Sequence, residues 1–227
     1  MAASISIKSA KANTIAEPIA IKPGWYVLAV LSMLMGFASI STDLYLPAMP
    51  LMAQSLVAET GMIELTISGY LIGFSLGQLL WGPISDRYGR RPSVAAGLVL
   101  FVFGSAGCAL ATSAQILIAW RVVQAVGACA GVALSRAMVR DFYQGNRAAQ
   151  MLSTLITVMT IAPLIGPTVG GQIVALAGWR AIFWVLVGVG LATLCALMSI
   201  PETLPVARRN QEHLGLAMLR YLTLLKN

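Results

Sequence analysis

Two charged side chains lie inside apolar stretches of this chain, where they could do chemistry. Asp43 follows the apolar run that begins at Trp25, and Arg121 lies within the run 119–126. A charge at membrane depth costs on the order of 2.5–3.5 kcal/mol, so such residues usually face a bundle interior or a watery cavity. A carboxyl group in surroundings of low polarity takes up a proton, and a nearby guanidinium favours release of that proton. The two residues therefore indicate proton exchange.

Sequence position also bears on whether these two side chains can meet. At a rise of about 1.5 Å per residue, Asp43 and Arg121 both lie within roughly 10 Å of the outer membrane surface. Two structural alternatives stay open at this point. The residues could form a static pair, or Asp43 could only cap the end of its helix.

A second polar segment, residues 82–92, separates two apolar runs. It holds two glycines, one carboxylate and three arginines: Gly82, Gly89, Asp86, Arg87, Arg90 and Arg91. The glycines predict a sharp reversal of the chain. The carboxylate can accept hydrogen bonds from the arginines or from a neighbouring helix N-terminus. Such a cluster would latch cytoplasmic helix ends and release them when helices rock. Topology alone would explain the arginines, but it does not require the carboxylate.

A third cluster combines prolines and glycines within one apolar run: Pro163, Gly166, Pro167, Gly170 and Gly171. Prolines remove backbone hydrogen bonds and bend a helix, whereas glycines permit close helix approach. This run is predicted to be a bent helix that packs closely on a neighbour.

Composition defines the elements that must position these residues. The chain has 227 residues, of which 58% are hydrophobic and 10% charged, against about 25% charged in soluble domains. A hydrocarbon core of about 30 Å requires apolar stretches of about 20 residues. We predict an all-α membrane protein with six spans. They lie at about 25–46, 61–82, 93–112, 115–138, 150–176 and 179–200.

The basic residues predict the orientation of these spans. Twelve of the fifteen fall on one side: Lys8, Lys11, Lys22, Arg87, Arg90, Arg91, Arg140, Arg147, Arg208, Arg209, Arg220 and Lys226. Because Lys and Arg favour the cytoplasmic side, both ends are expected there. Residues 1–24 form a tail, and 201–227 a basic loop that stops before a seventh helix. The net charge of +7 is spread between apolar runs, which does not favour a nucleic-acid surface.

An internal repeat relates the two halves of this bundle. Four residues recur at a constant spacing of 89: Gly77, Gly82, Gly89 and Arg91 return as Gly166, Gly171, Gly178 and Arg180. Three helices cross the membrane an odd number of times, so the two triplets are inverted. Inverted three-helix repeats within a six-helix half are a transporter architecture.

Residues that would support catalysis or metal binding are few. Cys108, Cys129 and Cys195 lie in apolar runs without metal-ligand spacing, and His213 is the single histidine. No nucleophile, base and orienting group are predicted to share a cavity. We expect no enzyme, no cofactor and no metal.

These motifs resemble those of the major facilitator superfamily. Residues 82–92 resemble its signature between helices two and three, and 119–127 its fourth-helix motif, whose arginine is implicated in proton coupling. Residues 162–171 look like the fifth-helix motif of antiporters. Residues 41–50 are similar to the end of helix one in the bicyclomycin and chloramphenicol resistance (Bcr/CflA) branch.

The resemblance implies a proton-coupled exporter of small drug-like molecules in a bacterial inner membrane. Two six-helix bundles would open their shared cavity alternately to each side. By carry-over, Asp43 is the proton and substrate site, Arg121 its coupling partner, and Gln124 a further cavity residue. The segment 82–92 is the cytoplasmic gate.

The chain departs from the family because it stops after the sixth span, where the family has six more helices. We expect a truncated half, with a second copy or a complementing chain supplying the other bundle. Besides lipid, its partners would be the drug and protons. Two alternatives remain: a metabolite exporter or facilitator on the same scaffold, and a non-transporting half that associates with a full-length relative.

Overall fold

The computed structural model describes residues 25–205 and residue 209. All regular elements in these residues are helical, and six helical segments are long and apolar enough to cross a membrane. The predicted all-α membrane fold with six spans is confirmed. Predictions for the N-terminal tail, for most of 206–227 and for His213 lie outside the described residues.

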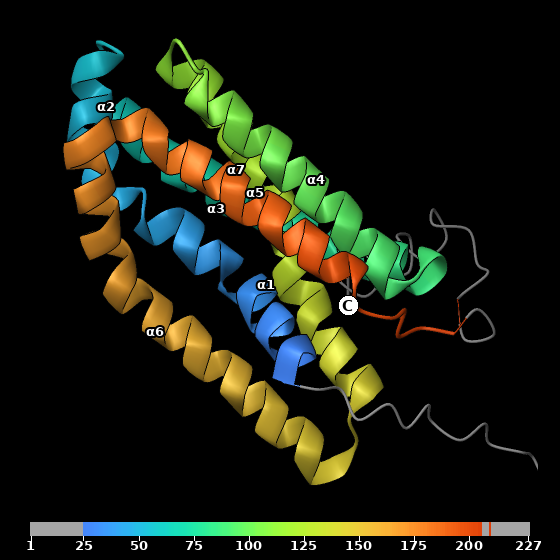
Figure 1. Ribbon diagram of the computed structural model, residues 1–227. Helices are drawn as coiled ribbons and strands as arrows, with labels where there is room; N and C mark the ends of the chain where they lie inside the picture. Colours follow the sequence, from blue (N-terminus) through green and yellow to red (C-terminus); the bar gives the residue numbers. More distant parts are fainter. Residues whose placement is uncertain (1–24, 206–208, 210–227) are drawn as a thin grey trace, which may run out of the picture.

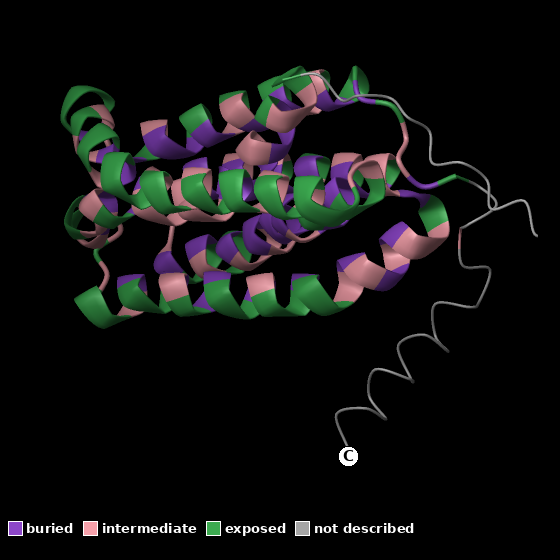
Figure 2. Ribbon diagram, turned by 90° about the horizontal axis from the view of Figure 1, so that it is seen from below, coloured by how far each residue is buried: buried purple, intermediate pink, exposed green. Residues whose placement is uncertain are grey.

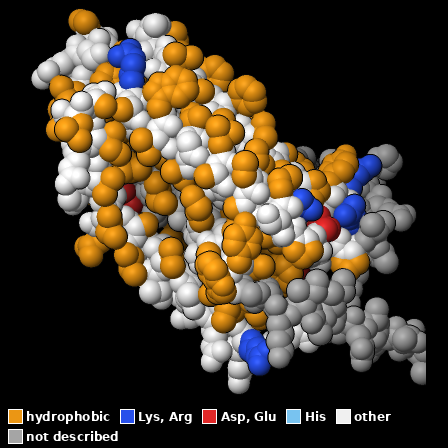
Figure 3. Space-filling view, in the orientation of Figure 1, with side chains coloured by type: hydrophobic (Ala, Val, Ile, Leu, Met, Phe, Trp, Pro, Cys, Tyr) orange, Lys and Arg blue, Asp and Glu red, His pale blue; other side chains and the backbone are white. Residues whose placement is uncertain are grey.

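Figure 1 shows long helices that run side by side as one bundle. The elements are α1 (Trp25–Asp43), η1 (Leu46–Ala48), α2 (Met49–Ser55), α3 (Thr60–Tyr88), α4 (Arg90–Ala109), α5 (Ala114–Phe142), α6 (Gly145–Ala177) and α7 (Trp179–Met198). In the view of Figure 3, hydrophobic side chains cover most of the face, and the arginines of the described residues lie toward its ends. This distribution fits a surface that faces lipid.

The first span differs from the single helix 25–46 expected from its hydropathy. Helix α1 ends at Asp43, and the short helices η1 and α2 complete an apolar segment that reaches Ser55. Prolines stand in the first turn of both short helices. Because proline fixes φ and lacks an N–H, it starts a new helix more readily than it continues an old one.

The sharp turn predicted across 82–92 is much shorter in the structure. Helix α3 continues through Gly82 and Pro83 to Tyr88, and α4 begins at Arg90. Gly89 alone makes the connection, with φ at 106°. A proline removes only one backbone hydrogen bond, which a long helix tolerates. Gly82 is therefore a helical residue and no turn.

Helix α5 lies at the centre of the bundle and packs on α1, α3 and α4. Over the apolar window of each helix, 56% of α5 is buried but only 6% of α6. Figure 2 shows the same pattern, with buried residues turned toward the interior and exposed residues along the outside. Helix α6 is thus an edge helix that meets the bundle mainly through α1.

The helix connections show that the two halves of the bundle are repeats. The first half is α1–α4 and the second is α5–α7. Gly89 and Gly178 both have positive φ, at 106° and 77°, and each alone separates two long helices. Their N–H groups donate to the carbonyls of Ser85 and Val174, at 3.0 and 2.9 Å. The donors and the acceptors are both 89 residues apart, so the repeat found in the sequence is present in the backbone.

Arginines at equivalent positions bind reciprocal helix ends. Arg91, at the start of α4, donates through Nη2 to the carbonyl of Met198, where α7 ends. Arg180, at the start of α7, donates through Nη2 to the carbonyl of Ala111 just beyond α4, at 3.1 Å. Helices α4 and α7 therefore run antiparallel, as inverted repeats require.

Candidate functional site

Arg121 lies on α5 and is fully buried, with 0% of its surface exposed. Its Nη1 donates to the carbonyl and the hydroxyl of Ser41 on α1, both at 3.3 Å. The same atom donates to Oε1 of Gln124, one turn further along α5, at 2.8 Å. The guanidinium therefore joins α1 to α5 through neutral oxygen atoms.

Gln124 extends this contact to a third helix. Its Nε2 donates to the hydroxyl of Ser105 on α4 at 2.8 Å, and that hydroxyl donates to the carbonyl of Phe101 at 2.7 Å. Gln124 and Ser105 are both 0% exposed. A buried polar chain thus connects α1, α5 and α4, and Gln124 lies within the bundle. Sequence reasoning missed Ser105, because serines are frequent in membrane helices.

Two tyrosines complete the surroundings of Arg121. Its Cζ lies 4.4 Å from the ring centroid of Tyr45 and 4.4 Å from that of Tyr70. Tyr45 follows α1, and Tyr70 belongs to α3. Guanidinium groups are attracted to aromatic faces at such distances. Sequence reasoning missed both tyrosines, although a buried arginine is itself a signal to look for aromatic partners.

Asp43 is the last residue of α1, and its side chain is partly buried. Its Oδ2 is buried and without a hydrogen bond. Asp43 and Arg121 form no ion pair, so the static pair left open by the sequence is not formed. The side chain lies instead at α6, where a Cβ added to Gly166 would be 2.6 Å from the Cβ of Asp43.

The proline and glycine cluster divides into two groups in the structure. Helix α6 continues through Pro163 and Pro167. Gly166 packs on Asp43, and Gly170 packs so closely on the backbone of Leu44 that a Cβ would overlap it. An added Cβ at Gly171 would meet no atom, and Pro163 is exposed. Two of the five residues therefore bring α6 against the end of α1.

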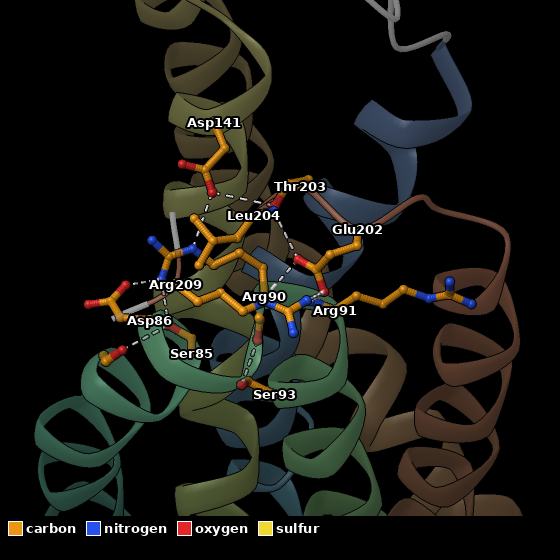
Figure 4. A network of polar contacts seen from close by, with 12 residues as sticks. Ser85, Asp86, Arg90, Arg91, Ser93, Asp141, Glu202, Thr203, Leu204 and Arg209 are labelled. Atoms are coloured by element: carbon orange, nitrogen blue, oxygen red, sulfur yellow. Dashed lines mark hydrogen bonds and ion pairs between the residues drawn. The ribbon is translucent and has the colours of Figure 1, made fainter. Parts of the chain in front are cut away.

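A second site lies where α3, α4 and α5 meet at one end of the bundle (Figure 4). Arg90 donates through Nη1 to Asp86 at 2.6 Å and to the Ser85 hydroxyl at 2.5 Å. Its Nε donates to Asp141 on α5 at 3.1 Å. The Asp86 carboxylate thus binds an arginine, as the first of its two sequence interpretations proposed.

The helix N-terminus at this end is bound by a different carboxylate. Glu202, beyond α7, accepts the backbone N–H groups of Arg90 and Arg91 at 2.9 and 3.2 Å (Figure 4). A carboxylate is stabilised there by the helix dipole. A Cβ at Gly89 would lie 2.7 Å from Glu202. Glu202 was absent from the predicted gate residues because it lies more than 100 residues from the motif.

Arg87 and Gly82 are the remaining predicted gate residues. The guanidinium of Arg87 lies 5.6 Å from the ring centroid of Tyr88. An added Cβ at Gly82 would meet nothing within 4 Å. Within residues 25–205 and 209, no three His, Cys, Asp or Glu side chains come together as a metal site would need.

Comparisons with known proteins place this arrangement in a family. Residues 25–226 match the Major Facilitator Superfamily. The chain is 39% identical over 169 residues to the chloramphenicol resistance protein of Pseudomonas aeruginosa, covering 73% of this chain and 40% of that protein. It is 33% identical over 200 residues to a bicyclomycin resistance protein homolog of Haemophilus influenzae, covering 88% and 50%.

A solved structure shows the same fold at low identity. The proton:xylose symporter XylE superposes with a TM-score of 0.74 at 19% identity, over 86% of this chain and 49% of that one. This chain belongs to the Major Facilitator Superfamily. It is a multi-pass membrane protein, and its family and fold indicate transport and not catalysis. It spans about half the length of the curated relatives that it matches.

Proposed function

We propose that this chain forms the N-terminal half of a proton-coupled exporter of small drug-like molecules. The observation that carries the proposal is the buried, unpartnered Oδ2 of Asp43 at the contact between α1 and α6. An ionised carboxylate without a partner is costly in such a place, so the group favours a proton. Relatives named for chloramphenicol and bicyclomycin resistance support a drug as the substrate.

The proton would be exchanged as the end of α1 changes its surroundings. In its neutral form Asp43 packs against Gly166 of α6. Movement of this end toward the positive charge of Arg121, or toward water, would favour release of the proton. Drug binding at the same end of α1 would then compete with the proton, which is the requirement for antiport.

Alternating access requires a gate at the cytoplasmic end. The contacts of Arg90 with Asp86 and Asp141 join three helices at one end of the bundle, and we assign this end to the cytoplasm. These ion pairs are partly hydrated, with 48% of the Asp86 side chain exposed. Such pairs contribute little net free energy, about 0–1 kcal/mol. They can therefore break and re-form as the bundle rocks.

A second six-helix bundle would complete the transporter. It would come from a second copy of this chain or from a complementing chain, and it would meet the exposed edge helix α6. The membrane would be a bacterial inner membrane. Both termini would lie in the cytoplasm, because Arg87, Arg140 and Arg147 belong to helix ends that adjoin Arg90.

A second candidate function is a non-transporting half that associates with a full-length relative. This second function is supported by the match, which covers only about half of each curated relative. It predicts a stable complex upon co-purification but no drug flux. A metabolite exporter on the same scaffold would give flux with a different substrate.

The test is drug accumulation in efflux-deficient bacteria that express this chain. It is measured with the chain alone, and with the C-terminal half of the Pseudomonas aeruginosa relative. We expect protonophore-sensitive export of chloramphenicol that is lost in Asp43→Asn. Export that persists in Asp43→Asn at equal membrane abundance would refute the assignment of the proton to Asp43. No export in either setting would favour the non-transporting half.

A further inference from the structure

The positive charge of Arg121 is buried without any carboxylate partner. Every hydrogen bond of the guanidinium leaves through Nη1, to Ser41 and Gln124. No Asp or Glu oxygen among the described residues lies within 4.0 Å of its nitrogens. A buried charge normally requires a counter-charge or full hydrogen bonding. Other groups must therefore stabilise it.

The other two nitrogens of Arg121 identify these groups. Both Nε and Nη2 are buried and have no hydrogen-bond partner. The faces of Tyr45 and Tyr70 are each 4.4 Å from Cζ. An aromatic face attracts a guanidinium most strongly when water is excluded. The two rings thus replace the missing acceptors.

Each ring also packs on a further aromatic side chain, Tyr45 on one from α7 and Tyr70 on one from its own helix. The hydroxyl of Tyr45 is hydrogen-bonded to that of Thr66 on α3. The ring centroids of Tyr45 and Phe183, on α7, are 6.0 Å apart. Tyr70 stacks on Phe74 at 6.4 Å and is 2% exposed. The rings therefore hold a defined position for the guanidinium. The hydroxyl of Tyr70 makes no hydrogen bond, so its contribution to the site is its ring.

Asp43 lies between two residues that both contact Arg121. Ser41 binds the guanidinium through hydrogen bonds, and Tyr45 binds it through its ring. Asp43 is two residues from each of them, yet it packs on α6. No ion pair joins its carboxylate to the guanidinium.

We propose that Tyr45 and Tyr70 are positioning residues that clamp Arg121 and thereby leave Asp43 unpaired and able to carry a proton. The clamp acts through the two rings, and Phe183 still packs on the Tyr45 ring when the hydroxyl bond to Thr66 is removed. Phenylalanine therefore replaces either tyrosine, whereas leucine releases the guanidinium toward Asp43. This inference rests on the proposed function only in giving the proton to Asp43.

The clamp is tested by nuclear magnetic resonance on the purified chain with ¹⁵N-labelled arginine in detergent micelles. The Arg121 Nε–H signal is assigned by its loss in Arg121→Lys. Ring currents from two faces shift this proton upfield. We expect the shift to persist in Tyr45→Phe and Tyr70→Phe and to collapse in Tyr45→Leu and Tyr70→Leu. Tyr88→Leu, which alters an exposed ring outside the clamp, leaves the signal unchanged.

Two results would overturn the clamp. One is an unshifted Arg121 signal in the native chain, which needs no variant to fold. The other is loss of the shift in the phenylalanine variants, because the hydroxyls would then be the essential groups. Size-exclusion profiles in the same detergent show which variants remain folded.

A second measurement separates the clamp from the proton. Dicyclohexylcarbodiimide modifies protonated carboxyl groups in apolar surroundings, and mass spectrometry locates the product. We expect labelling of Asp43 in the native chain and in the phenylalanine variants. In the leucine variants it falls by about tenfold, because a guanidinium partner favours the ionised carboxylate. Labelling that stays unchanged there would refute the link between the clamp and Asp43.

These two measurements distinguish the possible failures. An unlabelled native Asp43 with an intact ring-current shift would remove the proton from the proposed function and keep the clamp as a structural element. A missing shift with normal labelling would remove the clamp and keep the proton site.

Discussion

Two buried or half-buried arginines of this bundle are stabilised by different kinds of partner. Arg90, at the start of α4, binds carboxylates on α3 and α5. Arg121, within α5, binds a carbonyl, a hydroxyl, an amide and two aromatic rings. At the hydrated end an ion pair is exchanged with water at little cost. Within the membrane a charge that loses its partner costs about 3–5 kcal/mol.

This difference suits the two sites to different tasks. The Arg90 cluster can open and close because water replaces its partners. The Arg121 site is fixed, since no solvent reaches it, and a nearby carboxylate can change its protonation without breaking a structural ion pair. The comparison predicts that substitutions in the interior affect stability more than those at the hydrated end.

The largest expected effect is that of Gln124→Leu. It removes the acceptor at 2.8 Å from Arg121 and the donor to Ser105. A hydrogen bond to a buried charge contributes about 1.5–3 kcal/mol, so we expect a loss of about 3 kcal/mol in the free energy of unfolding. Denaturant unfolding in mixed micelles measures it. Gln78→Leu, at an exposed position of α3, is the matched control. Equal effects of the two would contradict the account.

Next in size is the packing of α6 on Asp43. Gly166→Ala places a Cβ 2.6 Å from that of Asp43, whereas Gly171→Ala meets no neighbour. Overpacking costs about 1–3 kcal/mol, and alanine in an open helical position is favoured over glycine by about 1 kcal/mol. We expect the midpoint temperature of thermal unfolding in detergent to fall for Gly166→Ala and to stay level or rise for Gly171→Ala. The reverse order would show that α6 does not pack on α1 here.

At the hydrated end, Arg90→Gln removes two ion pairs at 2.6 and 3.1 Å. Because these pairs are partly solvated, we expect a stability loss of about 1 kcal/mol that shrinks in high salt. Arg140→Gln, at an exposed position, is the control. A loss as large as that of Gln124→Leu, unchanged by salt, would remove the distinction between the two sites.

The smallest effect is expected at the reciprocal helix ends. Arg91→Gln and Arg180→Gln each remove a cation from the carbonyl end of the partner helix. Such contacts contribute about 0.3–1 kcal/mol. If α4 and α7 are held equivalently, the two variants lose similar stability and their effects add in the double variant. Strongly unequal losses of stability in the two variants would show that the two contacts do not contribute equally.

Much of this architecture is readable from the sequence, because hydropathy and charge act over whole segments. Six spans follow from apolar runs, and the 89-residue repeat foretells the matched turns at Gly89 and Gly178. The failures come from contacts that depend on helix rotation. Tyr45 and Tyr70 are ordinary membrane residues until Arg121 is seen beside them.

Two further errors have local causes. The reversal predicted across 82–92 relied on its two glycines, and α3 continues through the first of them. The carboxylate at the start of α4 comes from Glu202, far along the chain. Neither helix continuation through proline nor a distant partner is visible in a local motif.

The central claim is that Asp43 carries the proton that a drug displaces. It is tested most directly by proton release from the purified chain, assembled with a complementing six-helix half in weakly buffered detergent, upon addition of chloramphenicol. The account predicts release by the native assembly and none from Asp43→Asn, with drug binding measured in both. Equal release from Asp43→Asn, or drug binding without release in the native assembly, would contradict it.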